Sequence, residues 1–589
     1  MCGIVGYVGW REAGPLLVDS LKSLEYRGYD SCGVATVHQG KIWIKKDKGK
    51  IEQVDRKLRL KDLPGNIGFG HTRWATHGKV SKRNSHPHTD CEEEIAIIHN
   101  GIVENFSELK RELKRKGHKF RSETDTEVIA HLIEDNFRSG LNLEESVRRA
   151  MNSIRGRSAI IVAKRDFPGL VAARTGSPLI LGVGESEHFI ASDVLAFLNH
   201  TKKVMYLDDG EMVVVGKETK FMKIANGEEV RKRIITIDWD ATQAEKREYK
   251  HYMIKEIMEQ KETIMRAINQ DEEEIKRVAK EINRAYGVFL TGCGTAGKVC
   301  QTGEYIFSRI ANKHVNYVVS SEFPNYKHFL TKRTLLITVS QSGETADVLE
   351  AVKVAKEKGV KIISLVNVRG STLDRISDIT FLINAGPEKA VASTKATTAQ
   401  LAILYLLAYA CIGRLDEGRN LLLETASKIN DMLNPRYEEH IKKLARKIYR
   451  EKNIYVIGRG LNYPMALESA IKIMEVSYIH AQGFAGGELK HGPIALIEKG
   501  SPCIVLTAND GTNSIIGNAM EVKARGGFII GVGPKRNEVF DYWLKTPDVG
   551  LASPIVNIIP IQLLAYYLGV FKGCSIDQPR NLAKSVTVE

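Results

Sequence analysis

The sequence predicts a multidomain α/β protein, with a mainly β N-terminal part followed by doubly wound α/β domains with parallel sheets. Three observations support this fold class. The chain has 589 residues, which is too long for one hydrophobic core. Short apolar runs broken by glycine dominate its first ~238 residues, whereas strands alternate with helices beyond them. The second part also repeats itself at an offset of about 167 residues, as expected for two related domains in tandem.

The N-terminal part, residues 2–238, is predicted to be one β-rich domain. Two helical patterns interrupt its strand-like runs. The expected strands are residues 4–8, 33–37, 67–70 and 95–99, and the expected helices are residues 106–116 and 126–137. Near Asp238 a polar segment replaces the strand pattern and leads into a helical one, so residues 239–252 are expected to be a linker.

Two α/β domains are expected next, residues 253–435 and 436–574, followed by a tail, residues 575–589. Helical crossovers between strands favour parallel sheets. The internal repeat is visible in two pairs of segments: residues 288–294 resemble 454–460, and residues 334–367 resemble 503–534.

Composition narrows the possible partners and compartment. Lys and Arg exceed Asp and Glu by 85 to 71, but basic and acidic residues are mostly interleaved, which favours an ion-paired surface over a nucleic-acid interface. The longest apolar run, residues 401–412, is short for a membrane span, and the eight cysteines form no paired motif. We therefore expect a cytoplasmic protein that binds neither nucleic acid nor membrane.

Cys2 is a candidate nucleophile because it directly follows Met1. Removal of one methionine would give this residue both a thiol and a free α-amino group. The amine, with an ordinary pKa near ~8, can take up the thiol proton around neutral pH. One residue would then supply nucleophile and base together. Taken alone, a cysteine at this position is more often a small buried residue.

Residues 340–345 form a candidate anion site between a predicted strand and a predicted helix. Hydroxyls, a side-chain amide and backbone N–H groups at a helix N-terminus suit a phosphate. Helix capping alone would need only one such side chain. The matching loop of the second copy contains Asp510, whose charge would repel phosphate, so only the first copy is expected to bind the anion.

A group of histidines raises the question of a metal site. The residues are His71, His77, His86, His88 and His99. Their spacing fits no zinc pattern, and no thiolate stands at zinc spacing. Packing and hydrogen bonding are the expected roles, with no metal and no cofactor.

Several motifs resemble known families. In the first part, residues 26–31, 70–78, 99–102 and 122–127 are similar to the class II glutamine amidotransferases, which use an N-terminal nucleophile. In the second part, residues 293–295, 340–345, 391–395, 488–493 and 577–589 are similar to the sugar isomerase (SIS) family. The combination, over the whole length, resembles the isomerising glutamine–fructose-6-phosphate aminotransferases.

The resemblance implies both fold and reaction. The fold would be an αββα glutaminase domain with an N-terminal nucleophile, followed by two flavodoxin-like SIS domains. The enzyme would convert D-fructose 6-phosphate and L-glutamine into D-glucosamine 6-phosphate and L-glutamate, the first step of amino-sugar synthesis. Ammonia would pass internally between the two sites, and the active unit would be a homodimer.

By the same resemblance, Cys2 would attack the glutamine amide to give a thioester and ammonia. The Asn100 side chain and the Gly101 N–H would form the oxyanion hole. Arg73 would bind the glutamine α-carboxylate and Asp125 its α-ammonium, as their charges allow.

In the sugar site, the resemblance makes Lys584 the Schiff-base lysine and Glu475 the base that moves a proton between C1 and C2. His491, presented by the neighbouring subunit, would assist ring opening. Ser340, Gln341, Ser342 and Thr345 would hold the phosphate. Further substrate contacts are expected from Cys293, Thr295, Val391, Ser393 and Lys472, and Trp74 and Ala583 are expected to line the ammonia path.

One departure keeps alternatives open. The family often has serine directly after the Cys-Gly-Thr motif, where this chain has Ala296. One lost hydrogen bond is worth roughly 1 kcal/mol, which predicts weaker phosphate binding. Another sugar phosphate as acceptor is therefore a second reading. A non-catalytic SIS sensor of sugar phosphates is a third, although no helix-turn-helix pattern accompanies the SIS motifs.

Overall fold

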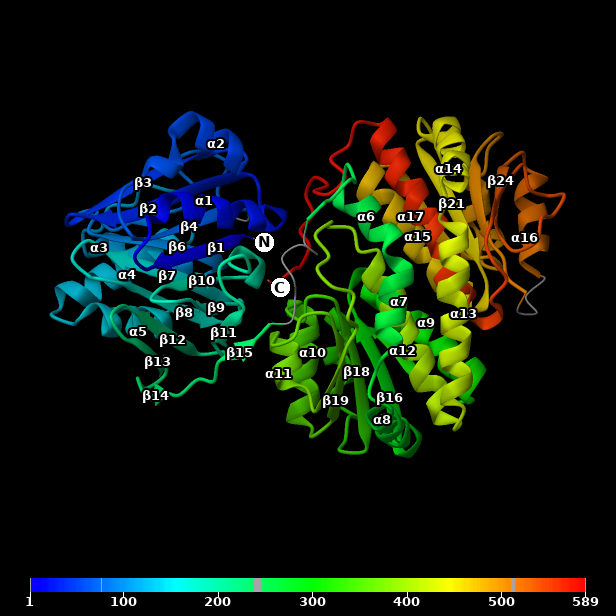
Figure 1. Ribbon diagram of the computed structural model, residues 1–589, viewed down its shortest axis with the longest axis horizontal. Coiled ribbons are helices and arrows are strands. Elements are labelled where there is room, and N and C mark those ends of the chain that lie inside the picture. The colour runs from blue at the N-terminus through cyan, green and yellow to red at the C-terminus, as the bar shows by residue number, and fades with distance from the viewer. Residues whose placement is uncertain (1, 76, 238–244, 510–513, 588–589) are drawn as a thin grey trace. The chain divides into compact units, whose positions relative to one another are not determined.

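The computed structural model describes residues 2–75, 77–237, 245–509 and 514–587. The described residues form two compact units, one from the N-terminal part together with the segment from Ala583 onward, the other from Glu245 to Leu582. In Figure 1 the N-terminal part of the first unit begins in blue and passes through cyan, the second unit runs from green to red, and the described residues from Ala583 onward are red. The predicted boundary at Asp238 and the first part of the expected linker lie outside the described residues.

Within its described residues, the first unit contains two antiparallel sheets. One has the order β15 (Ile235–Thr236), β11 (Lys203–Tyr206), β9 (Ile180–Val183), β10 (His188–Ala191), β1 (Gly3–Val8), β4 (Ile67–Arg73), β2 (Ser31–His38) and β3 (Lys41–Lys48). The other has the order β14 (Glu229–Val230), β13 (Thr219–Lys223), β12 (Glu211–Val215), β8 (Leu170–Thr175), β7 (Ser158–Lys164), β6 (Ile95–Gly101) and β5 (His88–Thr89).

Helices cover the outer face of each sheet. They are α1 (Ala13–Leu24) and α2 (Ile51–Leu58) on the first, and α3 (Phe106–Arg115), α4 (Glu127–Arg138) and α5 (Leu143–Ser153) on the second. Strand alternation produces these layers: Ile4 packs between the two sheets, while the next residue, Val5, packs under α1. Both faces are therefore buried, which confirms the predicted αββα arrangement.

The second unit contains two parallel sheets with the same topology. Their orders are β17 (Asn316–Val319), β16 (Gly287–Gly292), β18 (Thr334–Ser340), β19 (Lys361–Val366), β20 (Ile379–Leu382), and β22 (His480–Ala485), β21 (Asn453–Gly458), β23 (Pro502–Leu506), β24 (Phe528–Gly533), β25 (Tyr542–Lys545). Numbered within each copy, both read 2-1-3-4-5, the flavodoxin-like order. The internal repeat and the predicted doubly wound fold are confirmed.

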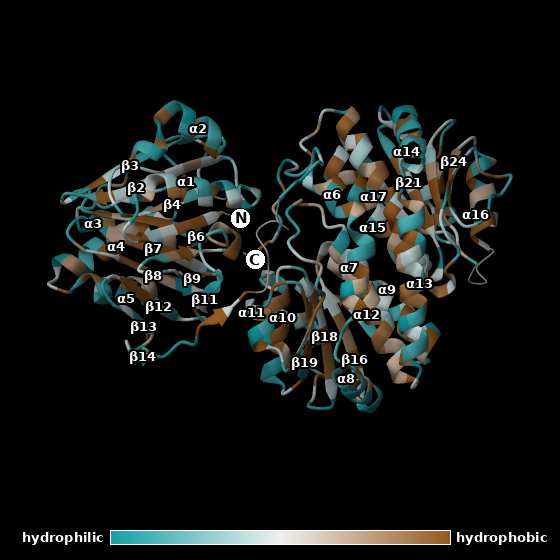
Figure 2. Ribbon diagram, in the orientation of Figure 1, coloured by the Kyte–Doolittle hydropathy of each residue, from teal (hydrophilic) through white to brown (hydrophobic). Residues whose placement is uncertain are grey.

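One continuous hydrophobic core joins the two copies. Its central helices are α7 (Gln260–Ile268), α9 (Gly294–Ala311), α12 (Lys395–Cys411), α15 (Tyr463–Ser477) and α17 (Ser553–Phe571), which lie between the sheets in Figure 1. The remaining helices are α6 (Tyr252–Met258), α8 (Glu272–Arg284), α10 (Ala346–Glu357), α11 (Thr372–Ile376), α13 (Leu415–Met432), α14 (Pro435–Ile448) and α16 (Ser514–Lys523). Figure 2 shows hydrophobic residues along the strands and hydrophilic ones on outer helices such as α8.

The segment Gly550–Phe571 is the one described helix long and apolar enough to cross a membrane, and 89% of its apolar window is buried inside the protein. This helix does not stand out as a long apolar run in the sequence, because the polar residues Asn557 and Gln562 interrupt it. Both are fully buried and paired: Asn557 donates to the Thr507 carbonyl at 2.9 Å, and Gln562 accepts from Gln260 at 2.8 Å. The helix is the core of the second unit.

Candidate active sites

Two neighbouring strands of the first sheet, β1 and β4, position Cys2. β1 pairs with β4 so that Gly3 lies opposite Thr72, which places Cys2 beside the end of β4. The backbone N–H of Trp74 donates to the Cys2 sulfur at 3.2 Å. Burial raises the pKa of the Cys2 thiol, and the Trp74 N–H and the Arg73 charge offset only part of that rise.

Asn100 and Gly101 end β6 next to this thiol. The Asn100 side-chain amide donates to the Cys2 carbonyl at 2.9 Å. Gly101 has φ 134°, and a Cβ there would stand 1.8 Å from the Arg157 carbonyl oxygen. Only glycine fits this position, because any side chain would collide with the Arg157 backbone. The backbone N–H of Gly101 lies next to Asn100 in the chain. The structure therefore brings Cys2, Asn100 and Gly101 together.

Arg73 and Asp125 supply buried charges of opposite sign in the same region. They are 3% and 4% exposed. Burial lowers the pKa of Arg73, and the charges of Cys2 and Asp125 act in the opposite direction. The Asp125 carboxylate accepts the Val103 N–H at 2.8 Å, which fixes its orientation. A buried cation and anion near a thiol can bind the two charged ends of an amino acid.

Four of the five histidines, His71, His86, His88 and His99, are buried in the first unit. His71 and His86 stack with ring centroids 4.0 Å apart, and the two ring nitrogens of His99 lie 3.0 Å from Thr126 Oγ1 and 3.1 Å from Ser158 Oγ. Burial lowers the pKa of His71 to about 3 and also lowers the pKa values of His86, His88 and His99. The rings of these four histidines take part in packing and hydrogen bonding.

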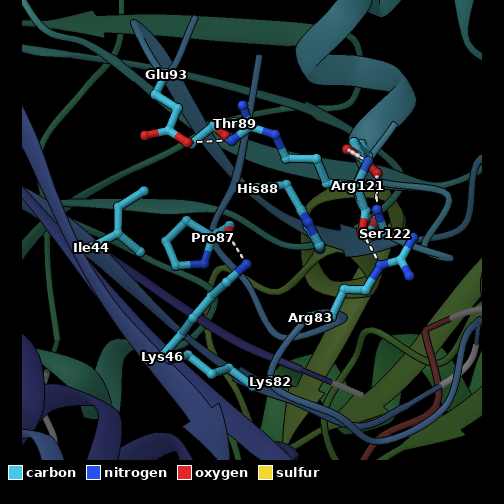
Figure 3. Close-up of a pocket in the computed structure, with 11 residues that line it drawn as sticks. Ile44, Lys46, Lys82, Arg83, Pro87, His88, Thr89, Glu93, Arg121 and Ser122 are labelled. Carbon is cyan, nitrogen blue, oxygen red and sulfur yellow. Dashed lines mark hydrogen bonds and ion pairs between the residues drawn. The ribbon is translucent and has the colours of Figure 1, made fainter. Parts of the chain in front are cut away.

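A separate basic pocket of about 530 Å³ opens in the first unit (Figure 3). None of the residues predicted for the glutamine site lines it. Most of its cations are already engaged: Lys46 donates to the Ser85 and Pro87 carbonyls at 2.7 and 2.6 Å, and Arg121 pairs with Glu93. Burial lowers the pKa of Lys46 to about 8.

The predicted phosphate loop lies at the switch point of the first parallel sheet. β16 and β18 are neighbours with connections to opposite sides, so the loops after both strands share one edge. Ser340 Oγ lies 3.0 Å from Thr345 Oγ1 and accepts the Gly343 N–H at 3.1 Å. Gly343 has φ 66°, and the loop ends where α10 begins. Hydroxyls therefore gather at a helix N-terminus.

The other predicted members of that edge lie close by. Cys293, at the end of β16, has its sulfur 3.9 Å from the Asp347 carboxylate in the first turn of α10. The Gln341 carbonyl accepts the Asn367 N–H at 3.1 Å, while the Ser342 hydroxyl accepts the Glu344 N–H at 3.2 Å. These hydrogen bonds fix the conformation of the loop before the N-terminus of α10.

A buried ion cluster joins the two copies. Thr295 donates to Glu468 at 3.0 Å, and the Lys472 ammonium lies 3.4 Å from Glu468 and 2.6 Å from Glu475. The side chains of Lys472 and Glu468 are 1% and 0% exposed, whereas that of Glu475 is 26% exposed. Burial raises the pKa of Glu468 to about 7. For Lys472, burial acts to lower the pKa, but Glu475 and Glu468 outweigh it and raise the pKa.

Glu388 is the residue near this cluster that sequence reasoning missed. Glu468 shares one helix face with Lys472 and Glu475 at i, i+4, i+7 spacing, which by itself is more typical of a solvent-facing ion-pair row, so no role is predicted for it from the sequence. Glu388 receives the Ser393 hydroxyl at 3.0 Å and the Thr394 N–H at 2.9 Å, and its charge also raises the pKa of Lys472. No local pattern marks it.

The remaining predicted residues are placed as follows. Val391 donates its N–H to the Asp577 carbonyl at 3.0 Å, which ties it to the C-terminal tail. His491 is exposed in the short helix η7 (Leu489–His491). Ala583 and Lys584 are half-buried and belong to the first compact unit, where Arg157 donates to the Thr587 carbonyl at 2.8 Å.

Family models match both units. A model described as SIS domain matches residues 281–410 and 447–566, the two parallel-sheet copies, and a model described as glutamine amidotransferase domain matches residues 71–199. The chain is 47% identical over 610 residues to the glutamine–fructose-6-phosphate aminotransferase (isomerizing) of Pyrococcus horikoshii, and 44% over 601 residues to that of Aquifex aeolicus. Each alignment covers 100% of both chains.

Solved structures resemble the second unit. The C-terminal domain of glucosamine-fructose-6-phosphate aminotransferase from Francisella tularensis is 33% identical, with a TM-score of 0.53, and the match covers 57% of this chain and 100% of that one. The tagatose-6-phosphate ketose/aldose isomerase of Escherichia coli has a TM-score of 0.50 at 16% identity over 56% of this chain and 96% of its own. At that identity the likeness concerns the fold alone.

Proposed function

Because the chain belongs to the isomerizing glutamine–fructose-6-phosphate aminotransferase family, we propose that it converts fructose 6-phosphate and glutamine into glucosamine 6-phosphate and glutamate. One observation carries this proposal. A single chain holds a half-buried thiol close to two buried side chains of opposite charge in its first unit, and a hydroxyl-rich helix N-terminus and a buried ion cluster in its second. The first arrangement suits an amino-acid amide, and the second suits a sugar phosphate.

In the first half-reaction, the Cys2 thiolate attacks the side-chain amide carbon of glutamine. The α-amine exposed by removal of Met1 takes the thiol proton and delivers it to the leaving nitrogen, so that ammonia departs and a thioester remains. Asn100 and the Gly101 N–H stabilise the tetrahedral oxyanion, at typically ~3 kcal/mol per donor. Water then hydrolyses the thioester to glutamate. Arg73 and Asp125 hold the substrate's carboxylate and ammonium.

In the second half-reaction, the residues around Ser340 and Thr345 hold the phosphate. Lys584 forms a Schiff base with the C2 carbonyl and releases water, and ammonia then replaces the lysine nitrogen at that carbon. Glu475 carries a proton from C1 to C2, which leaves the amino group on C2 and the aldehyde at C1. The Lys472 ammonium lies 2.6 Å from Glu475 and holds the carboxylate of this proposed base in place.

Ammonia must pass between the sites without entering bulk water, where it would be protonated at neutral pH. We assign Trp74, whose N–H contacts the Cys2 sulfur, and Ala583, next to Lys584, to that path. His491 is exposed, which suits a residue that assists ring opening in the partner of a homodimer. The eight free cysteines suit a reducing cytoplasm.

The test is isotope transfer. Purified protein is incubated with fructose 6-phosphate and glutamine labelled with ¹⁵N in its amide, and the products are identified by mass spectrometry. Label in a hexosamine phosphate is the expected result. Label found only in free ammonia would overturn the proposed acceptor while keeping the glutaminase.

Two variants separate the half-reactions. Cys2→Ala should abolish glutamine use and leave fructose 6-phosphate binding intact. Lys584→Ala should abolish amino-sugar formation while some glutaminase activity persists. A non-catalytic sensor would instead respond to ligand normally after Lys584→Ala. Glutamine-dependent product from Cys2→Ala would contradict the nucleophile assignment.

A second acceptor is worth testing because of Ala296. It lies in the first turn of α9, next to Thr295, at the same sheet edge as the phosphate loop. A serine there would add one hydroxyl. If fructose 6-phosphate gives no labelled product, other ketose and aldose phosphates should be offered in the same assay.

A further inference from the structure

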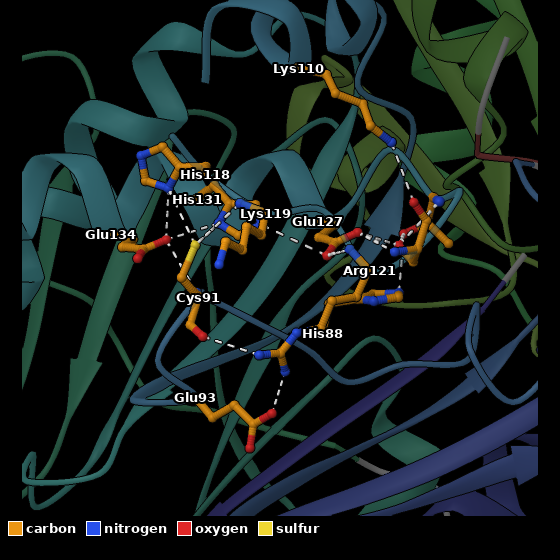
Figure 4. Close-up of polar contacts among 12 residues, drawn as sticks. His88, Cys91, Glu93, Lys110, His118, Lys119, Arg121, Glu127, His131 and Glu134 are labelled. Atoms are coloured by element: carbon orange, nitrogen blue, oxygen red, sulfur yellow. Dashed lines mark hydrogen bonds and ion pairs between the residues drawn. The ribbon is translucent and has the colours of Figure 1, made fainter. Parts of the chain in front are cut away.

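Four metal-binding side chains meet in the first unit, outside the residues assigned to the glutamine site (Figure 4). Their ligand atoms all lie within 4.8 Å of one another. The Cys91 sulfur is 3.8 Å from His118 Nδ1 and 3.7 Å from His131 Nδ1. One Glu134 oxygen, Oε2, is 2.8 and 2.9 Å from the same two nitrogens. Two imidazoles, a thiol and a carboxylate thus point at one centre.

Three separate segments build this cluster. Cys91 lies in the turn after β5, His118 lies just after α3, and His131 and Glu134 are three residues apart on one face of α4. The side chains of His118, His131 and Glu134 are only 1–3% exposed. A bound ion would cross-link the turn and both helical segments.

The outer side of each imidazole faces a carboxylate. His131 Nε2 is 3.7 Å from Glu127 Oε1, and His118 Nε2 is 3.6 Å from Asp135 Oδ1. Metal-bound histidines usually have such a partner on the second ring nitrogen, which fixes the tautomer and the ring orientation. Arg138 holds the other oxygen of Glu134 at 2.6 Å, so that Oε2 alone is directed at the centre.

The distances come close to those of a tetrahedral zinc site. Zinc–sulfur and zinc–nitrogen bonds of about 2.3 and 2.05 Å give ligand separations of about 3.6 Å for S···N and about 3.3 Å for N···O. The S···N separations already match, and the carboxylate oxygen would have to withdraw by only about half an ångström to make room for the ion.

We propose that Cys91, His118, His131 and Glu134 bind one Zn²⁺. The sulfur, nitrogen and oxygen donor set suits this borderline-soft ion. With all four ligands supplied by the protein, the site is closed and structural, and it takes no part in the proposed chemistry. It would secure α4, whose first residue directly follows the Asp125–Thr126 pair, and so stiffen the segment that presents Asp125. The sequence analysis expects no metal, so the proposal departs from it.

The first test is the metal content of the full-length protein. After exhaustive dialysis, elemental analysis should find one zinc per chain in the wild type and in Cys411→Ser, a half-buried cysteine outside the cluster. Cys91→Ser and Glu134→Gln should lose most of it. Wild-type protein free of zinc and unable to take it up, or Cys91→Ser with full zinc, would overturn the proposal.

Cobalt gives a readout specific to the ligand set. Wild-type protein reloaded with Co²⁺ should show strong visible bands of a tetrahedral site and a near-ultraviolet thiolate-to-cobalt band. Cys91→Ser should lose the thiolate band, and Cys411→Ser should keep it. If a variant does not fold, the wild type alone decides the question. Added zinc should raise its melting temperature by several degrees. If the wild type shows neither the cobalt bands nor a thermal shift, the proposed site is wrong.

Discussion

At the scale of single residues, burial rather than identity decides what the charged side chains of α15 can do. Glu468, Lys472 and Glu475 have the spacing of an ordinary exposed ion-pair row. The structure buries Glu468 and Lys472 completely and leaves Glu475 partly exposed at the end of the row. Lys472 pairs with both carboxylates, and burial raises the pKa of Glu468 to about 7.

Glu468→Gln should change the pH dependence of stability. The pKa of Glu468 is about 7 in the folded protein, above its ordinary ~4.3 in an unfolded chain. Between pH ~4.3 and pH about 7, Glu468 keeps a proton in the native state that it has lost in the unfolded state. The stability that this proton contributes is therefore fully present below pH ~4.3 and is lost as the pH rises through about 7. Glutamine does not titrate. As the pH is raised from about 5 to about 8, the melting temperature of the variant should therefore increase relative to that of wild type. The corresponding change in the difference in free energy of unfolding is at most roughly 3 kcal/mol.

Calorimetry at several pH values checks this prediction. Glu424→Gln, on the exposed face of α13, serves as the control, because its carboxylate is 60% exposed and should show no such trend. A difference between Glu468→Gln and wild type that stays constant with pH would contradict the assigned titration.

At the scale of elements, the two parallel-sheet copies share one topology, and the proposed phosphate loop belongs to the first copy. In both copies the third strand of the fold is followed by a loop and a helix, β18–α10 and β23–α16. In the first copy, Ser340, Ser342 and Thr345 surround the start of α10. The second copy has Ser514 as the first residue of α16, and its Asp510 lies outside the described residues.

Ser342→Ala should weaken fructose 6-phosphate binding without touching the glutaminase. A hydrogen bond to a charged group is worth about 1.5–3 kcal/mol, so the KM for the sugar should rise roughly tenfold or more. Steady-state kinetics with both substrates varied measures this, together with glutamate release in the absence of sugar. Ser514→Ala is the matched control and should leave the KM unchanged; equal effects of the two variants would argue against phosphate at α10.

At the scale of the whole molecule, the chain returns to its first unit at its end. The segment from Ala583 onward packs with the N-terminal part, and Thr587 is 1% exposed. Arg157 links this segment to the glutamine site: its guanidinium holds the Thr587 carbonyl at 2.8 Å, while its own carbonyl accepts the Ile102 N–H at 3.1 Å, directly after Gly101. The proposed Schiff-base lysine is thus carried by a segment anchored beside the proposed oxyanion hole.

Arg157→Met should uncouple the half-reactions more than it slows either one. With the anchor lost, ammonia should escape, and the ratio of glutamate formed to glucosamine 6-phosphate formed should rise from near one to roughly two or more. Parallel quantification of both products measures the ratio. Arg155→Met, exposed two residues earlier, should keep it near one. An unchanged ratio for Arg157→Met would show that this anchor does not serve coupling.

The sequence by itself determined a β-rich first part and a doubly wound second part, because strand runs, helical periodicity and the internal repeat can be read directly along the chain. The αββα arrangement of the first part followed from the resemblance of its motifs to the class II glutamine amidotransferases. The sequence also determined the family and the motif residues around Cys2 and Ser340. Their grouping follows from adjacent strand ends, β1 with β4 and β16 with β18, which topology rules anticipate.

Only the tertiary structure decided which charges are buried and which distant residues meet. The charge of Glu388 acts on Lys472 from a distant part of the sequence, and Cys91 joins His118, His131 and Glu134 from three separate segments. Interrupted apolar runs such as that of α17 were missed for the same reason, since Asn557 and Gln562 are tolerated only because buried partners receive them. Burial and long-range contacts depend on what packs over a residue, and no local pattern carries that information.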